Sequence, residues 1–188
     1  MDNVNRLLDC ALALFSQRGY EAVGVQEVVA AAGLTKPTLY HYFGSKRGLL
    51  EALLARETEP IIKAVSQAAV YQGDLVRTLE ALARAYFQVP KATPAFYRMS
   101  LAMRYSPPES ETYQSILPFA RQQQRLLEKV FIQAAEDHGN IHGRHRRYAV
   151  GFLGGIHSAI GLSTQGEWDL DEGAVYQLVH QFLHGIFS

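Results

Sequence analysis

Apolar residues recur at spacings of three and four along almost the whole chain, which is the pattern of amphipathic helices. In the first such segment, residues 6–18, one face is apolar, Asn3 is a candidate N-cap and Gly19 is placed to end the helix. That face consists of Leu7, Leu8, Ala11, Leu14 and Phe15. The sequence has no strand signal of any length and no internal repeat, so it predicts an all-α protein.

The same periodicity continues beyond residue 46. We expect helices over residues 46–57, 60–71, 75–89, 94–105, 109–138, 144–164 and 172–187. Pro60 is expected to open the second of these helices, and Asp74 and Asp171 are expected to cap two later ones. Pro118 lies inside the segment 109–138, where it should either kink the helix or mark a new first turn.

The stretch from Gly24 to Gly48 differs from the rest. It is typical of two short helices joined by a tight turn at Gly33 and followed by the start of a third helix capped by Ser45. The second short helix, residues 36–43, has five side chains that can form hydrogen bonds and only two clearly apolar ones, Leu39 and Phe43. A helix–turn–helix unit places such a polar second helix in the major groove of DNA.

Charge and composition narrow the possible functions. The 18 basic and 18 acidic residues give a formal net charge of zero, which argues against a general polyanion binder. However, residues 28–50 contain no Asp or Glu, so Lys36, Lys46 and Arg47 form a local positive patch that can attract phosphate. The single cysteine favours a reducing, cytoplasmic setting, and the apolar runs favour neither a signal peptide nor a membrane partner.

The segments ALALFSQRGYEAV and VVAAAGLTKPTLYHYFGSKRGLL resemble the DNA-binding domain of the TetR/AcrR family of bacterial transcription regulators. The most specific block is LYHYF at residues 39–43, followed after one residue by Ser45-Lys46. The resemblance covers about the first 55 residues and is only architectural beyond residue 60. It implies an all-α fold of about nine helices, with a three-helix helix–turn–helix domain at residues 1–46 and a ligand-binding and dimerisation domain at residues 47–188.

The resemblance also implies which residues meet double-stranded DNA. They are Thr35, Lys36, Pro37, Thr38, Tyr40, His41, Tyr42 and Lys46. Lys46 and the free N–H groups at its helix start would bind phosphate, whereas Lys36 and Thr38, with Tyr42 and His41 as further candidates, would read bases. Tyr40 is equally well interpreted as a core anchor, and His41 as a surface residue without a contact.

Two positions depart from the family pattern. Members often have Ser or Thr opening the first helix of the motif, but Val23-Gly24-Val25 offers no hydroxyl, so a backbone N–H would have to replace that phosphate contact. Gly48 stands where an acidic residue is common, which leaves the capping box at Ser45 incomplete.

In the larger domain the resemblance implies a small-molecule effector, and the supply of aromatic and methionine residues favours a largely apolar or aromatic one. The candidate ligand-binding residues are Tyr86, Met99, Met103, Tyr113, Phe119 and His157. Ordinary core packing remains the alternative for each of them.

The last two helices are expected to form a homodimer, and two copies would build a four-helix bundle that lets the dimer read a palindromic operator. The candidate interface residues are Gly151, Gly154, Gly155, Ser158, Leu178, Phe182 and Ile186, with His180 and His184 beside them.

Other functional classes have weaker support. His138, His142 and His145 cluster with Asp137 around residues 139–143, but their spacing matches no closed metal site, so we expect neither a metal nor a cofactor. The sequence contains no nucleophile elbow, Walker loop or dinucleotide fingerprint, so we expect no enzyme. The favoured hypothesis is a ligand-released repressor. A helical-bundle enzyme and a helical adaptor that does not bind DNA are the alternatives, and activation in place of repression stays open.

Overall fold

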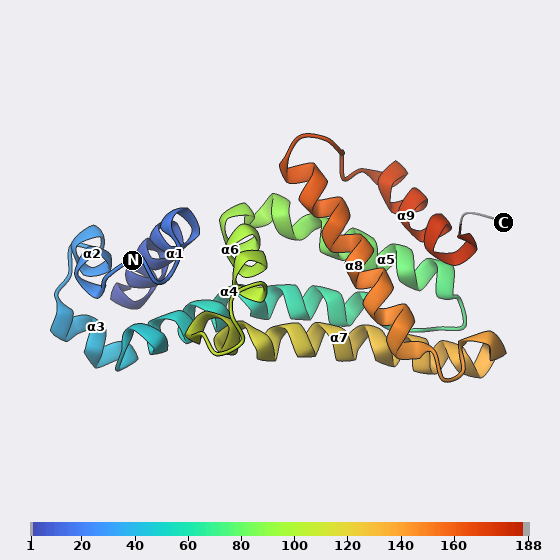
Figure 1. Ribbon diagram of the computed structural model, residues 1–188, viewed down its shortest axis with the longest axis horizontal. Coiled ribbons are helices and arrows are strands. Elements are labelled where there is room, and N and C mark those ends of the chain that lie inside the picture. Colours follow the sequence, from blue (N-terminus) through green and yellow to red (C-terminus); the bar gives the residue numbers. More distant parts are fainter. Residues whose placement is uncertain (1, 186–188) are drawn as a thin grey trace. The chain divides into compact units, whose positions relative to one another are not determined.

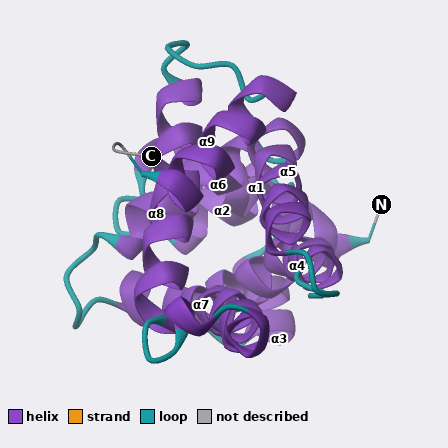
Figure 2. Cartoon of the chain, turned by 90° about the vertical axis from the view of Figure 1, so that its right-hand side faces the viewer, coloured by secondary structure: helices purple, strands orange, loops and turns teal. Residues whose placement is uncertain are grey.

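The computed structural model describes residues 2–185, and all regular secondary structure in this part of the chain is helical (Figures 1 and 2). The predicted all-α class is therefore confirmed. The nine α-helices of the described residues are α1 (Asn3–Arg18), α2 (Val25–Ala31), α3 (Lys36–Phe43), α4 (Lys46–Ala68), α5 (Leu75–Ala92), α6 (Pro94–Arg104), α7 (Glu111–Asp137), α8 (His145–Thr164) and α9 (Glu172–His184). A single 3₁₀ turn, η1 (Gly139–Ile141), joins α7 to α8.

By their internal contacts, the residues fall into two compact units. The first unit is Met1–Pro60 with Thr93–Ala120, and the second is Ile61–Ala92 with Arg121–Ser188. Helices α4 and α7 each contribute residues to both units. This grouping reflects packing, and the functional division between residues 46 and 47 stays a prediction.

In the first unit α1 forms the centre, because it packs against both α2 and α6. Four residues of its predicted apolar face are buried, namely Leu7, Leu8, Ala11 and Phe15. Three short helices alone would bury too little apolar surface, and α6 supplies a further packing partner. The N-cap is Asp2 and not Asn3 as predicted: the Asp2 carboxylate accepts a hydrogen bond from Val4 N–H at 3.3 Å, while Asn3 is the first helical residue.

The prediction that Pro60 opens a separate helix was wrong, because α4 continues through Pro60 to Ala68. A proline inside a helix removes one backbone hydrogen bond. Here its ring is exposed, while Leu54, Ile61 and Val65 keep the buried face continuous at spacings of seven and four. Tertiary packing along that face therefore outweighs the local breaking tendency. Pro118 is likewise exposed inside α7, which also continues past it.

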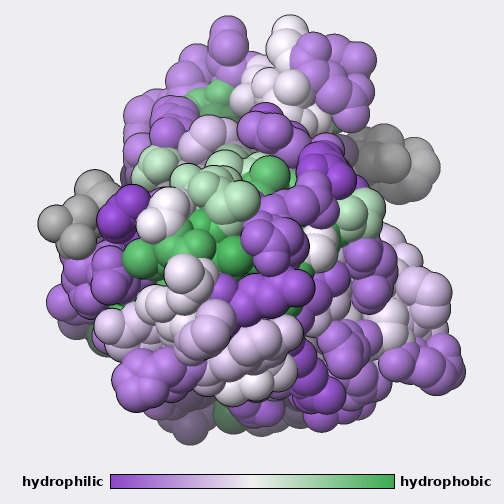
Figure 3. All heavy atoms as spheres, turned by 90° about the vertical axis from the view of Figure 1, so that its left-hand side faces the viewer, coloured by the Kyte–Doolittle hydropathy of each residue, from purple (hydrophilic) through white to green (hydrophobic). Residues whose placement is uncertain are grey.

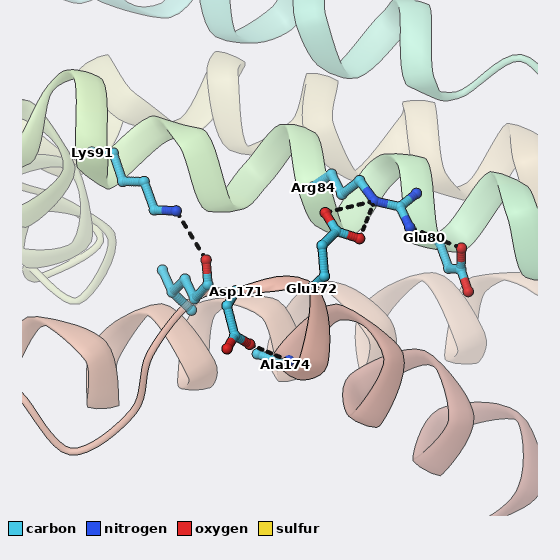
Figure 4. A network of polar contacts seen from close by, with 7 residues as sticks. Glu80, Arg84, Lys91, Asp171, Glu172 and Ala174 are labelled. Atoms are coloured by element: carbon cyan, nitrogen blue, oxygen red, sulfur yellow. Dashed lines mark hydrogen bonds and ion pairs between the residues drawn. The ribbon is translucent and has the colours of Figure 1, made fainter.

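In the second unit α5 packs against both α8 and α9. Figure 4 shows the polar contacts that fix the start of α9: Arg84 Nε donates to the Glu172 carboxylate at 2.8 Å, and Lys91 Nζ donates to the Leu170 carbonyl at 2.9 Å. Asp171 caps α9 as predicted, accepting from Ala174 N–H at 2.8 Å. The predicted cap of α5 is also confirmed, since Asp74 accepts from Arg77 N–H at 2.9 Å.

Helix α9 is shorter than the predicted segment 172–187, because it ends at His184. Gly185 follows with a positive φ of 71°, a conformation that favours glycine and stops the helix. Ile186, a candidate interface residue, lies outside the described residues.

Candidate functional site

The turn between α2 and α3 follows the predicted helix–turn–helix geometry. Gly33 has a φ of +62°, and Leu34 N–H donates to the Val29 carbonyl at 2.8 Å, which closes the turn. Helix α3 then spans the predicted residues, Lys36–Phe43. Its anchor is Leu39, whose side chain is fully buried. Phe43, the other apolar side chain of α3, is half-buried, so the apolar contact of the helix is small and most of its residues stay exposed.

Most of the side chains predicted to meet DNA are exposed. Exposed residues of this set are Thr35, Lys36, Pro37, Tyr40, His41 and Tyr42, while Thr38 and Lys46 are half-buried. Tyr40 keeps 46% and Tyr42 keeps 43% of their surface accessible, so neither is a core anchor. The side of the molecule on which Figure 1 draws α2 and α3 is seen in Figure 3, where hydrophilic side chains surround a smaller hydrophobic patch. The first unit therefore exposes hydroxyl, imidazole and ammonium groups on one short helix.

At the start of α3, Thr35 occupies the N-cap position, but its hydroxyl does not cap the helix. It shares a hydrogen bond of 2.9 Å with the Thr38 hydroxyl. This bond places both hydroxyl groups together at the start of the helix. A second contact orients His41, whose ring lies edge-on to Tyr42 with the centroids 5.2 Å apart.

Lys46 is held by a residue that sequence reasoning missed. Its ammonium lies 4.0 Å from the centroid of the Tyr20 ring, a cation–π contact. The Tyr20 hydroxyl donates to Glu111 Oε2 at 2.7 Å, so the first residue of α7 fixes the ring on which Lys46 rests. Burial raises the pKa of Tyr20, and the Glu111 carboxylate adds to this, so Tyr20 stays a protonated donor at neutral pH. In the sequence, this role of residue 20 was indicated by its hydroxyl group, which a phenylalanine would lack.

The start of α4 is capped as predicted, because Gly48 N–H donates to Ser45 Oγ at 2.9 Å. The structure also explains glycine at position 48. A Cβ atom added there would lie 2.0 Å from the Phe43 carbonyl oxygen, so the turn from α3 into α4 leaves no room for a side chain. This departure from the family pattern is therefore a packing requirement of the turn.

The other departure from the family pattern is the missing hydroxyl before α2, and the backbone N–H of Gly24 is not free to replace its phosphate contact. This N–H donates to Glu27 Oε1 at 2.9 Å, which is half of a capping-box arrangement. Glu27 also forms an ion pair with Arg18. The hydrogen bond from the Gly24 N–H and then the contact with Arg18 lower the pKa of Glu27, so this carboxylate is charged at neutral pH. It therefore already accepts the hydrogen bond that the Gly24 N–H could otherwise give to a phosphate.

Comparisons with known proteins agree with this geometry. Residues 7–53 match the family model described as bacterial regulatory proteins, tetR family. Over 189 residues the chain is 30% identical to the HTH-type transcriptional activator FasR of Mycolicibacterium smegmatis, an alignment that covers 97% of this chain and 82% of FasR. The chain belongs to the TetR family. It is accordingly a DNA-binding transcriptional regulator with an N-terminal helix–turn–helix domain, and the relatives named here are regulators rather than enzymes.

Two further comparisons refine the picture of this TetR-family regulator. Over 56 residues it is 52% identical to the HTH-type transcriptional repressor KstR of Rhodococcus jostii, covering 30% of this chain and 26% of KstR. Its fold is similar to that of the transcriptional regulator FadR from Bacillus subtilis, solved in complex with stearoyl-CoA, with a TM-score of 0.79 and 18% identity. That alignment covers 97% of this chain and 98% of FadR.

The predicted ligand-binding residues of the regulator divide between the two units. Met99 and Met103 are buried and line a cavity of about 510 Å³ beside Tyr20 in the first unit, whereas Tyr86 and His157 contact each other in the second. Their ring centroids are 6.2 Å apart. The remaining two, half-buried Tyr113 and buried Phe119, lie on the part of α7 that belongs to the first unit. Their role in binding an effector stays a prediction.

The predicted dimer residues of α8 lie along one stripe of the helix, within an arc of about 100°. A Cβ atom at Gly155 would lie 3.1 Å from Leu178, and one at Gly151 would lie 3.7 Å from Phe182, so these two glycines let α9 of the same chain approach α8. Gly154 and Ser158 are both exposed, and a Cβ atom at Gly154 would meet nothing within 4 Å.

The histidine cluster near residues 138–145 gives no metal site. Among residues 2–185 no three His, Cys, Asp or Glu side chains are close enough together to hold an ion. His145 instead faces Glu128, with Nε2 and Oε1 3.4 Å apart. Nor does any helix of the described chain have the length and apolar character needed to cross a membrane.

Proposed function

We propose that this regulator is a homodimer that binds a palindromic operator and is released from it by a small molecule. The observation that carries the proposal is α3, a helix in which Leu39 is fully buried while Lys36, Tyr40, His41 and Tyr42 are exposed. In helix–turn–helix proteins such a helix enters the major groove. Operator binding also supports a cytoplasmic location.

Within this proposal the motif residues have different tasks. Lys46 binds a phosphate, because it is the first residue of α4 and a helix N-terminus favours an anion. Lys36 and Thr38, close to the start of α3, read base edges together with Tyr42, while Thr35, Pro37 and Tyr40 set the position on the backbone. His41 is placed by its ring contact with Tyr42.

The two-fold dimer is supported by the outward face of α8. Gly154 and Ser158 are exposed one turn apart, and Val150, one turn earlier, keeps 54% of its surface accessible. Small residues let two helices approach closely, and an exposed apolar side chain gains by burial. A two-fold axis would then place two α3 helices at successive major grooves, about 34–36 Å apart.

The effector is proposed to be an amphipathic, largely apolar molecule. The FadR neighbour was solved with stearoyl-CoA, and both units of this chain contain cavities with apolar walls. Effector binding would displace α4 and change the separation of the two α3 helices. By linkage, operator DNA must then weaken effector binding by the same factor. KstR is a repressor and FasR an activator, and we propose repression because release by ligand needs no further partner.

The test is selection of binding sites from a random duplex pool at physiological salt, with the mass of the free protein measured by light scattering. Enrichment of an inverted repeat together with a dimeric mass is the expected result. A dimeric mass without any enriched sequence would contradict the proposal. A monomeric mass with an enriched single half-site would contradict the two-fold arrangement alone.

A further inference from the structure

A cavity of about 450 Å³ lies at one end of the second unit, where no ligand residue was predicted from the sequence. Its walls come from the start of α5, the end of α7, η1, the start of α8 and the end of α9 (Figure 1). The volume is within the range of about 300–1,000 Å³ that is usual for small-molecule sites. Three stretches of the chain, residues 73–76, 131–148 and 182–184, thus build one pocket.

The interior of this cavity is mainly apolar and aromatic. Phe131, Tyr148 and Phe182 all line it, and their ring centroids lie 5.8 to 6.2 Å from one another, so the three rings form one packed wall. Leu75 and Val76, at the start of α5, supply an aliphatic part of the wall. Such a surface favours an aliphatic or aromatic group over a charged one.

A group of arginines lies next to the cavity. Asn140, Ile141 and Tyr148 line the cavity, and the segment between them, residues 142–147, contains Arg144, Arg146 and Arg147. All three arginines are exposed, and their guanidinium groups have no ion-pair or hydrogen-bond partner among the described residues.

Three carboxylates in this part of the unit, including Asp74 of the cavity lining, contact groups other than these three arginines. Asp137 accepts from the Tyr71 hydroxyl at 2.7 Å, Asp74 caps α5, and Glu128 faces His145. None of these contacts involves Arg144, Arg146 or Arg147, so the three guanidinium groups can accept an anion from outside the chain.

Helical geometry separates the three arginines. Tyr148 N–H donates to the Arg144 carbonyl at 3.1 Å, so Arg144 lies one turn before Tyr148 on the same face. Arg147 lies three residues after Arg144 and therefore neighbours it on the helix surface. Arg146 lies on the opposite face, because two residues correspond to about 200° of rotation. Measured around the helix axis from Tyr148, which lines the cavity, Arg144 is about 40° away, Arg147 about 100° and Arg146 about 160°, so Arg144 and Arg147 are the two arginines nearer to the cavity.

We propose that this cavity binds the apolar part of an amphipathic anion whose carboxylate or phosphate is held by Arg144 and Arg147. The inference rests on the proposed function, since it names the site and the chemical class of the effector. Two guanidinium groups one turn apart can hold such a head with charge-assisted hydrogen bonds, which are roughly twice as strong as neutral ones. His138 and His184, which also line the cavity, add donors at its polar rim.

The experiment is calorimetric titration of the full chain with stearoyl-CoA, with stearate and with coenzyme A, below the concentration at which the acyl probes form micelles. The first variant is Arg144→Gln/Arg147→Gln, and its control of equal charge change is Arg121→Gln/Arg146→Gln, in which both residues are exposed and lie off the cavity face. The second variant is Val76→Trp at a lining residue that is 50% exposed, with Ile132→Trp, 48% exposed and away from the cavity, as its control.

The expected result is that an acyl probe binds the wild type, and that both test variants weaken its binding about tenfold while both controls leave it unchanged. Loss confined to stearoyl-CoA identifies phosphate as the head group, and equal loss for stearate identifies carboxylate. Failure of both acyl probes to bind the wild type would overturn the proposal, as would equal affinities of the test variants and their controls.

The failure of this site is distinguishable from the failure of the proposed function. Operator binding is measured on the same samples by anisotropy of a labelled duplex. If the acyl probe binds as expected but operator affinity does not respond, the cavity stands and the effector role is wrong. If the probe fails while a selected operator is still bound, only the cavity inference is lost.

Discussion

The DNA-binding motif and the cavity of the second unit are built in opposite ways. In the motif, seven of the eight residues predicted to meet DNA lie within one continuous stretch, Thr35 to Tyr42, on a helix with one buried leucine. In the cavity, the lining comes from three separate stretches, residues 73–76, 131–148 and 182–184. A site built from consecutive residues leaves a readable sequence pattern, whereas a site assembled by tertiary packing does not.

The same contrast applies to the two regions' glycines. In the motif, Gly48 is required by a close backbone approach, and in α8, Gly155 is required by a side chain of α9. The first constraint is local in sequence, since Phe43 is five residues away. The second involves Leu178, 23 positions further along the chain.

Gly48→Ala tests how strictly the turn holds α3 against α4. An added Cβ would lie 2.0 Å from the Phe43 carbonyl oxygen, so the backbone must shift and α3 must move with it. We expect operator affinity to fall more than tenfold, with a lower melting temperature. The control is Gly161→Ala in α8, where a Cβ meets nothing within 4 Å and should stabilise the helix by about 0.5–1 kcal/mol. Equal behaviour of the two variants would contradict the constraint.

Lys36→Ala and Tyr42→Ala test the exposed face of α3. Each should cost about 1–3 kcal/mol of binding free energy at particular base pairs, if the side chain reads a base edge. The measurement is anisotropy with the operator and a set of single-base variants, with Lys63→Ala in α4 as the exposed control. A loss that is uniform over all base variants would reassign the residue to backbone positioning.

Lys46→Ala tests the predicted phosphate contact. Removing one phosphate-binding cation should weaken binding to every sequence and lower the slope of log affinity against log salt by roughly one. The slope is obtained from titrations at four or more salt concentrations. An unchanged slope would show that Lys46 does not face phosphate.

Tyr20→Phe tests the support beneath Lys46, and its effect on DNA should be the smallest. The ring under the ammonium is kept while the hydrogen bond to Glu111 is lost, so we expect a loss of about 1–2 kcal/mol in the free energy of unfolding and little change in the salt slope. Tyr20→Leu, which also removes the ring, should lower affinity further. Equal affinities of the Phe and Leu variants would rule out a role for the cation–π contact.

Much of the motif could be predicted because its determinants are local. The bounds of α3, the turn at Gly33 and the cap at Ser45 follow from residues within a few positions of each other. The misplacement of a helix start at Pro60 has the opposite cause, because the buried face through Ile61 and Val65 continues the helix and only tertiary packing reveals it.

Other parts of the site were beyond reach of the sequence for the same reason. The support of Lys46 by Tyr20 and Glu111 joins residues 91 positions apart, and the cavity wall of Phe131, Tyr148 and Phe182 depends on three interhelical contacts. Aromatic and methionine content indicated that the larger domain could bind an apolar molecule. Composition alone could not indicate which of these side chains line the same cavity.

The central claim is that two α3 helices, held by a two-fold dimer, read successive major grooves of one palindrome. It is tested most directly by inserting about five base pairs, half a helical turn, between the half-sites of the selected operator. The account predicts at least a tenfold loss of affinity and recovery after an insertion of about ten base pairs, since one half-site first turns to the opposite face and then returns. Unchanged affinity after the half-turn insertion would contradict it.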